Sequence, residues 1–343
     1  MTPTLFADLG LLIILLGLAL LITAARPAFI AVAAYMAYGL VMALAWVRLA
    51  AVDVALTEAA IGSGLTGLLL LGAVAWSQRH TQFQARRLGL RPGIPRRAGA
   101  GRGLTLLVAL ACGGVSAGLA WVVLTLPEPA PSQVPLVQAA LPITGLGNPV
   151  TGVLLVFRAI DTLLESVVLV FALVGVWSLA SDPAWGGRPR SLHVVQHSGA
   201  LVLLGQLLPP VGILMGLYLF WVGADAPGGA FQGGTMLAAM WLLVLSAGLA
   251  EVPAVASRRL RLLITGGPLL FLAVGFSGWA FAAGFLGYPP AWSKPLILAI
   301  EAALTLSIAA ALAMLVAGPP ERPTAADPQP DPQPERNQQR GHR

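Results

Sequence analysis

The stretch Arg158-Ala159-Ile160-Asp161-Thr162-Leu163-Leu164-Glu165 places three ionisable side chains inside a long apolar run, from Val150 to Leu179. In a helix, the spacings of three and four residues between Arg158, Asp161 and Glu165 put these side chains on one narrow face. A charge inside a lipid-spanning helix is costly, so such residues are functional by default and face protein or water rather than lipid. This stretch therefore indicates a functional membrane helix.

The whole chain has the composition of a membrane protein. Apolar residues make up 57% of its 343 residues and charged residues only 10%. Several apolar runs reach the ~20 residues that a helix needs to cross a bilayer. The sequence therefore predicts an all-α polytopic membrane protein, and its positive net charge is no sign of nucleic-acid binding. The single cysteine, Cys112, excludes a disulfide within the chain and a Cys metal cluster.

Nine transmembrane helices are predicted from the apolar runs and from the Gly, Pro and Arg residues between them. Their expected ranges are Leu5–Ala25, Ala28–Val47, Asp53–Trp76, Gly103–Leu126, Val150–Leu179, Gly199–Val222, Phe231–Ala250, Leu262–Leu286 and Pro295–Ala317. The N-terminal run carries Asp8 and ends in Arg26, so we expect no cleavable signal peptide there. The tail, residues 318–343, is poor in apolar residues and is expected to be disordered.

Loop charges predict the orientation of these helices. The segment Gln78–Arg102 is rich in arginine, so the positive-inside rule makes it cytoplasmic. Alternation then places the N-terminus outside and the C-terminus in the cytoplasm, and it puts the Arg-free segment Pro127–Pro149 outside. Only Arg48 and Lys294 fall at the outer face.

The third predicted helix contains Gly62-Ser63-Gly64-Leu65-Thr66-Gly67, which matches the dinucleotide pattern GxGxxG. Because it lies within an apolar span, we interpret it as a small-residue face for close helix packing, with a kink or π-bulge. Two acids precede it. Asp53 lies near the outer boundary, where we expect it to be solvated, whereas the deeper Glu58 is a candidate for an ion path.

A glycine-rich segment, residues 223–234, joins two predicted helices at the outer face. It lacks the Lys-Ser/Thr of a P-loop, so we interpret its glycines as structural, with Gly229 and Gly233 at helix-packing spacing. Asp225 is expected to cap the following helix. His193 and His197 are four residues apart, but no third metal ligand is near in sequence, so we favour interfacial packing and expect no metal site.

The last predicted helix contains Glu301, with Thr305 one turn further on the same face and Lys294 at the membrane boundary. Two interpretations of Glu301 stay open: it takes part in ion transfer, or it pairs with a cation of a neighbouring subunit.

Three motifs together resemble one family. Asp53–Gly62 is similar to the small D-type subunit of membrane-bound hydrogenases, which is also the C-terminal part of the Mrp antiporter A subunit. Asn148-Pro149-Val150, followed by Arg158, Asp161-Thr162 and Glu165, resembles the E-type pattern N-V-V … R-x-x-D-T-x-x-E. Residues 223–234 resemble the hallmark G-H-N-A-P-G-G-G-F-x-G-G of the antiporter B subunit, with matches at Gly223, Pro227, Gly228, Gly229, Phe231, Gly233 and Gly234.

This sequence departs from the B-subunit pattern at three positions. Ala224 stands where the family has His, Asp225 where it has Asn, and Ala230 where it has Gly. Any part that the family His has in proton handling is therefore in doubt here. The change to Ala230 is mild only if that position does not need a positive φ.

The resemblance implies a fusion of the Mrp/Mnh type: a D-type segment at residues 1–126, an E-type segment at 127–190 and a B-type domain at 191–317. It implies a non-enzymatic subunit, without a cofactor, of a multisubunit Na⁺/H⁺ antiporter in a bacterial or archaeal cell membrane. The partners would be other membrane subunits, the lipid bilayer, Na⁺ and H⁺.

Two roles for the intramembrane charges remain open. They line an ion path, with Glu165 as the deepest residue and Asp161, Arg158, Glu58 and Glu301 as further candidates, or they only hold subunits together in an assembly scaffold. A redox-linked complex related to hydrogenases or respiratory complex I is the alternative to a free-standing antiporter.

Overall fold

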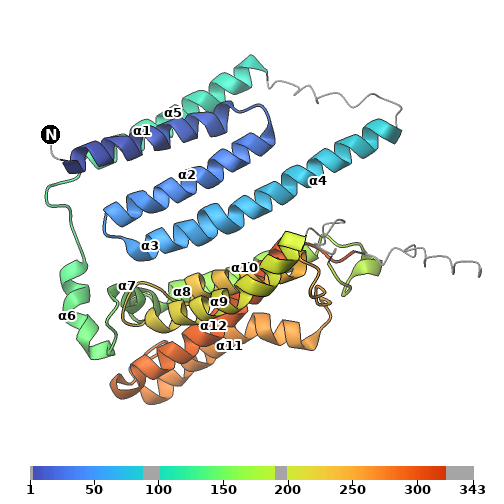
Figure 1. Cartoon of the computed structure of the whole chain (residues 1–343). Coiled ribbons are helices and arrows are strands. Elements are labelled where there is room, and N and C mark those ends of the chain that lie inside the picture. The colour runs from blue at the N-terminus through green and yellow to red at the C-terminus, as the bar shows by residue number, and fades with distance from the viewer. Residues whose placement is uncertain (1–2, 88–100, 190–198, 322–343) are drawn as a thin grey trace, which may run out of the picture.

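A computed structural model describes residues 3–87, 101–189 and 199–321, and within these ranges the chain is built from helices (Figure 1). The elements are α1 (Pro3–Ala24), α2 (Ala28–Arg48), α3 (Val52–Thr57), the π-helix η1 (Glu58–Leu65), α4 (Thr66–Arg87), α5 (Arg102–Thr125), α6 (Val134–Thr144), α7 (Pro149–Gly152), the π-helix η2 (Val153–Phe157), α8 (Ala159–Trp177), the 3₁₀-helix η3 (Asp182–Ala184), α9 (Gly199–Val222), α10 (Ala230–Ser246), α11 (Arg258–Phe281), the 3₁₀-helix η4 (Pro290–Trp292) and α12 (Ser293–Ala317).

The described ranges confirm the polytopic helical class. They contain 8 helices that are long and apolar enough to cross a membrane, and these correspond to eight of the nine predicted spans. The ninth, expected at Phe231–Ala250, is the apolar but shorter helix α10, which has 17 residues. His193, His197 and residues 322–343 of the tail lie outside the described residues, and the orientation in the membrane stays a prediction.

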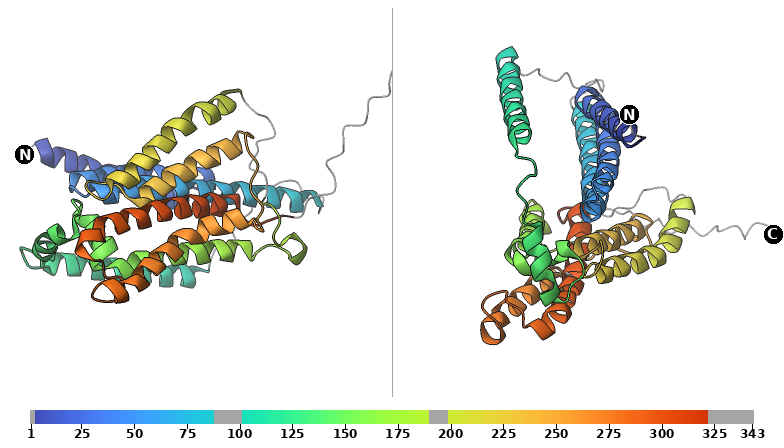
Figure 2. Two further views of the ribbon diagram at one scale, coloured as in Figure 1. Left: turned by 90° about the horizontal axis from the view of Figure 1, so that it is seen from below. Right: turned by 90° about the vertical axis from the view of Figure 1, so that its left-hand side faces the viewer.

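The helices form two groups and one separate member. α1 to α4 lie side by side in one layer, and α8 to α12 form a bundle around α12 (Figures 1 and 2). The buried apolar core lies in this bundle, where Phe271 and Ile300 are fully buried. α5 stands apart, with its side chains from Gly103 to Thr125 exposed (Figure 2). An exposed apolar helix of this length is stable only against lipid or another apolar surface.

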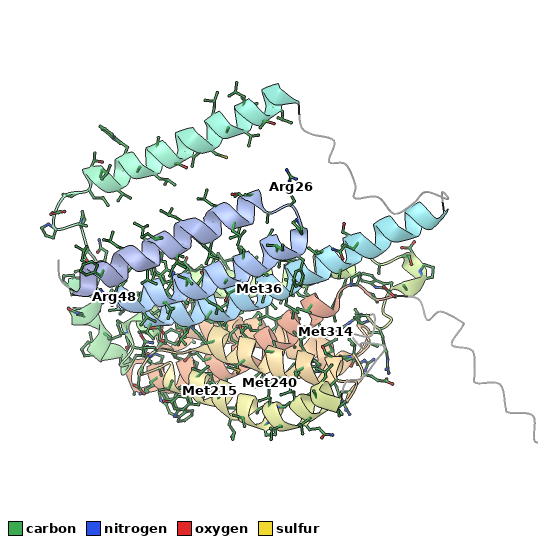
Figure 3. All side chains as sticks on the ribbon, turned by 45° about the horizontal axis from the view of Figure 1, so that its top comes forward. Arg26, Met36, Arg48, Met215, Met240 and Met314 are labelled. Carbon is green, nitrogen blue, oxygen red and sulfur yellow. The ribbon has the colours of Figure 1, made fainter. Side chains whose placement is uncertain are left out.

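The expected π-bulge is confirmed, and close packing on α2 is confirmed at Ser63 and Gly67, whereas Gly62 and Gly64 meet atoms of their own helix. η1 is a π-helix, and Ser63 lies so close to α2 that a Cβ on Gly39 would come within 2.8 Å of the Ser63 Cβ. One turn further, the Met36 side chain of α2 fills the space beside Gly67 (Figure 3). A larger residue at Gly39 would press α2 against η1, and one at Gly67 would press α4 against Met36 of α2, so these glycines set the spacing of the N-terminal layer.

The predicted continuous helix Val150–Leu179 is wrong, because the helix breaks at Arg158. Arg158 has φ −132° and ψ 37°, outside the helical region. Its N–H donates to Val153 O in a π-helical bond, and the Thr162 hydroxyl reaches back to Leu154 O at 2.7 Å. A hydroxyl that satisfies a freed carbonyl stabilises such a break inside an apolar environment.

A second feature absent from the expected topology is α6. It lies within the segment Pro127–Pro149, which the sequence predicts to be a loop, and it meets the helix from Pro149 to Phe157 at 86°. Figure 1 shows α6 lying across one end of the bundle. The helix is apolar, but it has only 11 residues and contains Pro142, so its sequence resembles a Pro-rich loop.

Both cations that fall at the predicted outer face have a carboxylate partner. Arg48, labelled in Figure 3, pairs with Asp8 of α1 at 3.0 Å. Lys294 pairs with Asp225 at 2.6 Å. Each of these cations therefore lies beside an opposite charge. Their presence at the predicted outer face does not conflict with the orientation that the loop charges predict.

Candidate ion-binding cavity

Three carboxylates that are distant in sequence line one cavity of ≈ 360 Å³. They are Asp53 of α3, Glu165 of α8 and Glu301 of α12. The remaining lining includes Gln232 and three threonines, and otherwise consists of apolar side chains and glycines. None of the cavity's lining residues is Lys or Arg. A cavity with this charge attracts cations and protons rather than anions.

Asp53 is held by hydrogen bonds, and the expectation that it is merely solvated is wrong. Its Oδ1 accepts the Gly228 N–H at 3.0 Å and the Asn148 side-chain amide at 3.3 Å. Asp53 also begins the first turn of α3, where a negative charge favours the helix. One carboxylate thus connects α3 with two distant segments of the chain.

Asn148 ties the helix that starts at Pro149 to the glycine-rich segment. Its side-chain oxygen accepts the Val150 N–H and caps the helix, while its amide donates to Gly223 O and Ala226 O, each at 3.1 Å. The Thr151 hydroxyl donates to the same Gly223 O at 2.6 Å. The resemblance singles out Asn148 as a motif residue, and the structure supplies a physical reason for it.

The glycine-rich segment makes close backbone contacts that leave no room for larger side chains. Gly228 and Gly229 have φ values of +158° and +128°, which favour glycine. Gly233 packs so closely on α9 that a Cβ would lie 2.7 Å from Gly216 O, and at Gly234 a Cβ would lie 2.9 Å from the Ile308 Cβ. Gly229, however, is the residue before α10 and does not form a packing pair with Gly233.

The structure shows the surroundings of the three residues that depart from the B-subunit pattern. Asp225 does not cap α10, because it lies four residues before the N-cap Gly229 and turns to Lys294 instead. Ala230 is the first residue of α10 and does not have a positive φ, so its methyl group is tolerated. Ala224, at the position of the family His, is fully buried, and its carbonyl accepts the N–H groups of Gly147 and Asn148.

Glu301 is the most enclosed of the three carboxylates. It is only 2% exposed, and a backbone hydrogen bond joins it to Ala230 at the start of α10. Its Oε2 atom is buried without a hydrogen-bond partner. Its backbone oxygen accepts the Thr305 hydroxyl at 2.7 Å, so Thr305 shares its face of the helix as expected.

The five expected ion-path residues do not all meet. Glu165 and Glu301 line the cavity, with Glu165 on its exposed side. Arg158 and Asp161 form an ion pair at 2.6 Å, and neither lines the cavity. The Glu58 side chain lies against Gly62 of its own helix and near Gly39 of α2.

Two cavity residues, Asp53 and Gln232, are not among the ion-path residues that the sequence predicts. Asp53 was singled out but assigned no partner, and Gln232 was hidden at the variable position of the glycine-rich pattern. The signal that points to Gln232 is its place between the pairs Gly228-Gly229 and Gly233-Gly234, in the first turn of a helix that follows a tight connection.

Comparison with known proteins divides the chain into three matched regions. Residues 13–79 match MbhD, the family of the D subunit of MBH, and residues 100–183 match MbhE, the family of the E subunit of MBH. Residues 200–319 match the family described as a domain related to the MnhB subunit of the Na⁺/H⁺ antiporter. Asp53, Glu165 and Glu301 come from these three regions in that order.

One curated relative and one solved structure match most of this chain. The chain is 26% identical over 279 residues to a probable K⁺/H⁺ antiporter A/B subunit of Rhizobium meliloti (strain 1021), covering 73% of this chain and 26% of that protein. Among solved structures, it is 25% identical to a chain of the Mrp complex from Dietzia sp. DQ12-45-1b, with a TM-score of 0.63, covering 92% of this chain and 35% of that one.

A second solved structure shares the fold. It is a chain of the membrane-bound sulfane sulfur reductase, an archaeal respiratory membrane complex, with 24% identity and a TM-score of 0.52, covering 62% of this chain and 96% of that one. The chain is therefore a multi-pass prokaryotic membrane protein. Its three matched regions support a fusion of the Mrp/Mnh type, and the chain spans about a quarter of the length of the curated relative it matches.

Proposed function

We propose that this chain is a membrane subunit of a monovalent cation/proton antiporter complex, and that the cavity lined by Asp53, Glu165 and Glu301 is part of its ion path. The observation that carries the proposal is the convergence of one carboxylate from each matched region on one cavity without a lining cation. Carboxylates inside a membrane segment mark ion and proton pathways.

The relatives support antiport, but they differ in the cation. The B-type region matches a domain named for a Na⁺/H⁺ antiporter, whereas the curated relative is named for K⁺/H⁺ exchange. We therefore propose a monovalent cation and leave both ions as substrates to be tested. Other membrane subunits are the proposed partners, and the exposed α5 offers them a large apolar surface.

Glu165 provides the first test. In everted membrane vesicles that contain the assembled complex, Glu165→Gln should lower cation/proton exchange at least about tenfold, because it removes a charge from the proposed path. Glu128→Gln, in the exposed segment after α5, is the matched control and should exchange ions like the wild type. Cation/proton exchange at the wild-type rate by the Glu165→Gln complex would contradict the proposed ion path.

An assembly scaffold is the second candidate function, favoured by the apolar helix α5, which has no packed neighbour among the described helices. Native gel electrophoresis separates the two. A scaffold variant loses the complex, whereas a path variant keeps the complex and loses flux.

A further inference from the structure

The Gln232 side chain has a fixed orientation inside the cavity. Its Nε2 donates to the Thr57 hydroxyl at 3.0 Å and to Asp53 O at 3.4 Å. Both acceptors belong to α3, so the amide nitrogen faces α3 and the amide oxygen faces away from it. That oxygen lies 3.3 Å from the point where a Cβ on Gly229 would stand.

Glu301 reaches the same point from the opposite element. Its Oε1 also lies 3.3 Å from the Cβ position of Gly229, while Oε2 is buried and has no hydrogen-bond partner. A buried carboxylate oxygen without a partner is expensive, and its presence in a native structure calls for an explanation. An ion bound there would provide the missing partner.

The two side chains therefore frame a space that only glycine leaves open. A carboxylate and an amide oxygen are hard ligands of the kind that alkali and other hard cations prefer. We propose that Glu301 and Gln232 together bind a partly dehydrated monovalent cation beside Gly229, with Gln232 as the neutral ligand that sets its position and contributes to the choice between Na⁺ and K⁺. This inference rests on the proposed antiport function and names its binding site.

The charges around this space agree with a cation site. Asp53 of α3 and Glu165 of α8 line the same cavity, and Lys294, the nearest cation along α12, is engaged with Asp225. The N-terminus of α10 carries a partial positive charge that would repel a cation. Its first residue, Ala230, however, is hydrogen-bonded to Glu301, so the helix end fixes the carboxylate, whose Oε1 lies at the space beside Gly229 and whose Oε2 has no hydrogen-bond partner.

The decisive variant is Gln232→Met, which keeps an unbranched side chain of similar length and removes the oxygen ligand. Equilibrium binding of ²²Na⁺ and ⁸⁶Rb⁺, the latter as a K⁺ analogue, is measured on the purified complex by scintillation proximity. Loss of one neutral ligand should weaken binding about tenfold, and by different factors for the two ions. Glu301→Gln should abolish binding at this site, and Gln206→Met, an exposed glutamine on α9, should bind like the wild type.

If the complex with Gln232→Met fails to assemble, Gln232→Glu provides a second test of the cation site. It retains an oxygen ligand and adds negative charge, so it should bind both ions at least as tightly as the wild type. Unchanged binding by Gln232→Met, or weaker binding by Gln232→Glu, would overturn the site. If instead the wild-type complex exchanges neither Na⁺ nor K⁺ for protons, the proposed function fails, whatever the variants do.

Discussion

At the scale of single residues, Asp53 joins three parts of the chain through one oxygen atom. Its Oδ1 accepts hydrogen bonds from Asn148, 95 residues away, and from Gly228, 175 residues away. When an amide N–H in a partly buried site loses its acceptor, the folded state is destabilised by most of the free energy needed to remove that N–H from water. The acceptor oxygen of Asp53 should therefore matter for stability independently of its charge.

Replacing Asp53 separates these two contributions. Asp53→Ala removes the acceptor and should lower the free energy of unfolding by about 1–3 kcal/mol. Asp53→Asn keeps a side-chain oxygen and should stay close to the wild type. Thermal unfolding of the purified complex in detergent measures both, and an Asp53→Ala complex as stable as the wild type would contradict the bonding role. Ion exchange by the Asp53→Asn complex then reports the effect of charge alone.

Arg158 and Asp161 illustrate how neighbouring charges differ in use. Their ion pair sits where the helix breaks, with side chains 70% and 37% exposed, so the pair itself adds little stability. Asp161 lies in the first turn of α8, where a negative charge is favourable, and it holds the Arg158 guanidinium, which would otherwise oppose the helix dipole. Asp161 thus stabilises the start of α8 through its position in the first turn, while Glu165, one turn further on, lines the cavity.

At the scale of elements, glycines decide how closely the helices approach. α9 and α10 meet through reciprocal contacts, since a Cβ on Gly216 would lie 3.1 Å from Gly233 O and a Cβ on Gly233 would lie 2.7 Å from Gly216 O. This contact holds the start of α10, and with it Gln232, beside α9. Close packing at small residues replaces the hydrophobic effect as the force between helices in lipid.

Gly233→Ala tests this contact. The methyl group would meet backbone rather than a flexible side chain, so the helices must separate, and overpacking of this kind costs about 1–3 kcal/mol. Gly266→Ala in α11 is the matched control, because a Cβ there has no neighbour within 4 Å, and it should be neutral or stabilising by about 0.5–1 kcal/mol. The melting temperatures of the two purified variants measure the difference. Equal values would refute the contact.

At the scale of the whole molecule, the sequence predicted what depends on local pattern. Apolar length and loop punctuation indicated the class and eight of the spans, and the clustered glycines indicated the π-helix at Glu58–Leu65. The break at Arg158 was missed because hydrophobic periodicity is the same on both sides of it. The sequence did not predict that Asp53, Glu165 and Glu301 line one cavity. They meet only after the three regions fold together, and their spacing along the chain does not indicate this contact.

Orientation is the whole-molecule property that still rests on the charge pattern alone. Four exposed tryptophans lie near the ends of α5, α9 and α11 and just before α12: Trp121, Trp221, Trp279 and Trp292. Another, Trp185, lies in the connection after α8. Figure 1 shows the ends that carry the first four on one side of the molecule, and such aromatic residues mark a membrane interface. Arg102 at the start of α5 and Arg258 at the start of α11 lie at the opposite ends of these helices, so the tryptophan side is predicted to face outward.

Single cysteines in a Cys112→Ser chain test this orientation. Ala130→Cys lies in the exposed segment after α5, on the tryptophan side, and Ala256→Cys lies in the exposed connection before α11. In intact cells, a membrane-impermeant maleimide should label the cysteine at position 130, and it should label position 256 only after permeabilisation, because the positive-inside rule places Arg258 and its neighbours in the cytoplasm. The reverse pattern would invert the chain and place the tryptophan side, with the glycine-rich segment that lines part of the cavity, toward the cytoplasm.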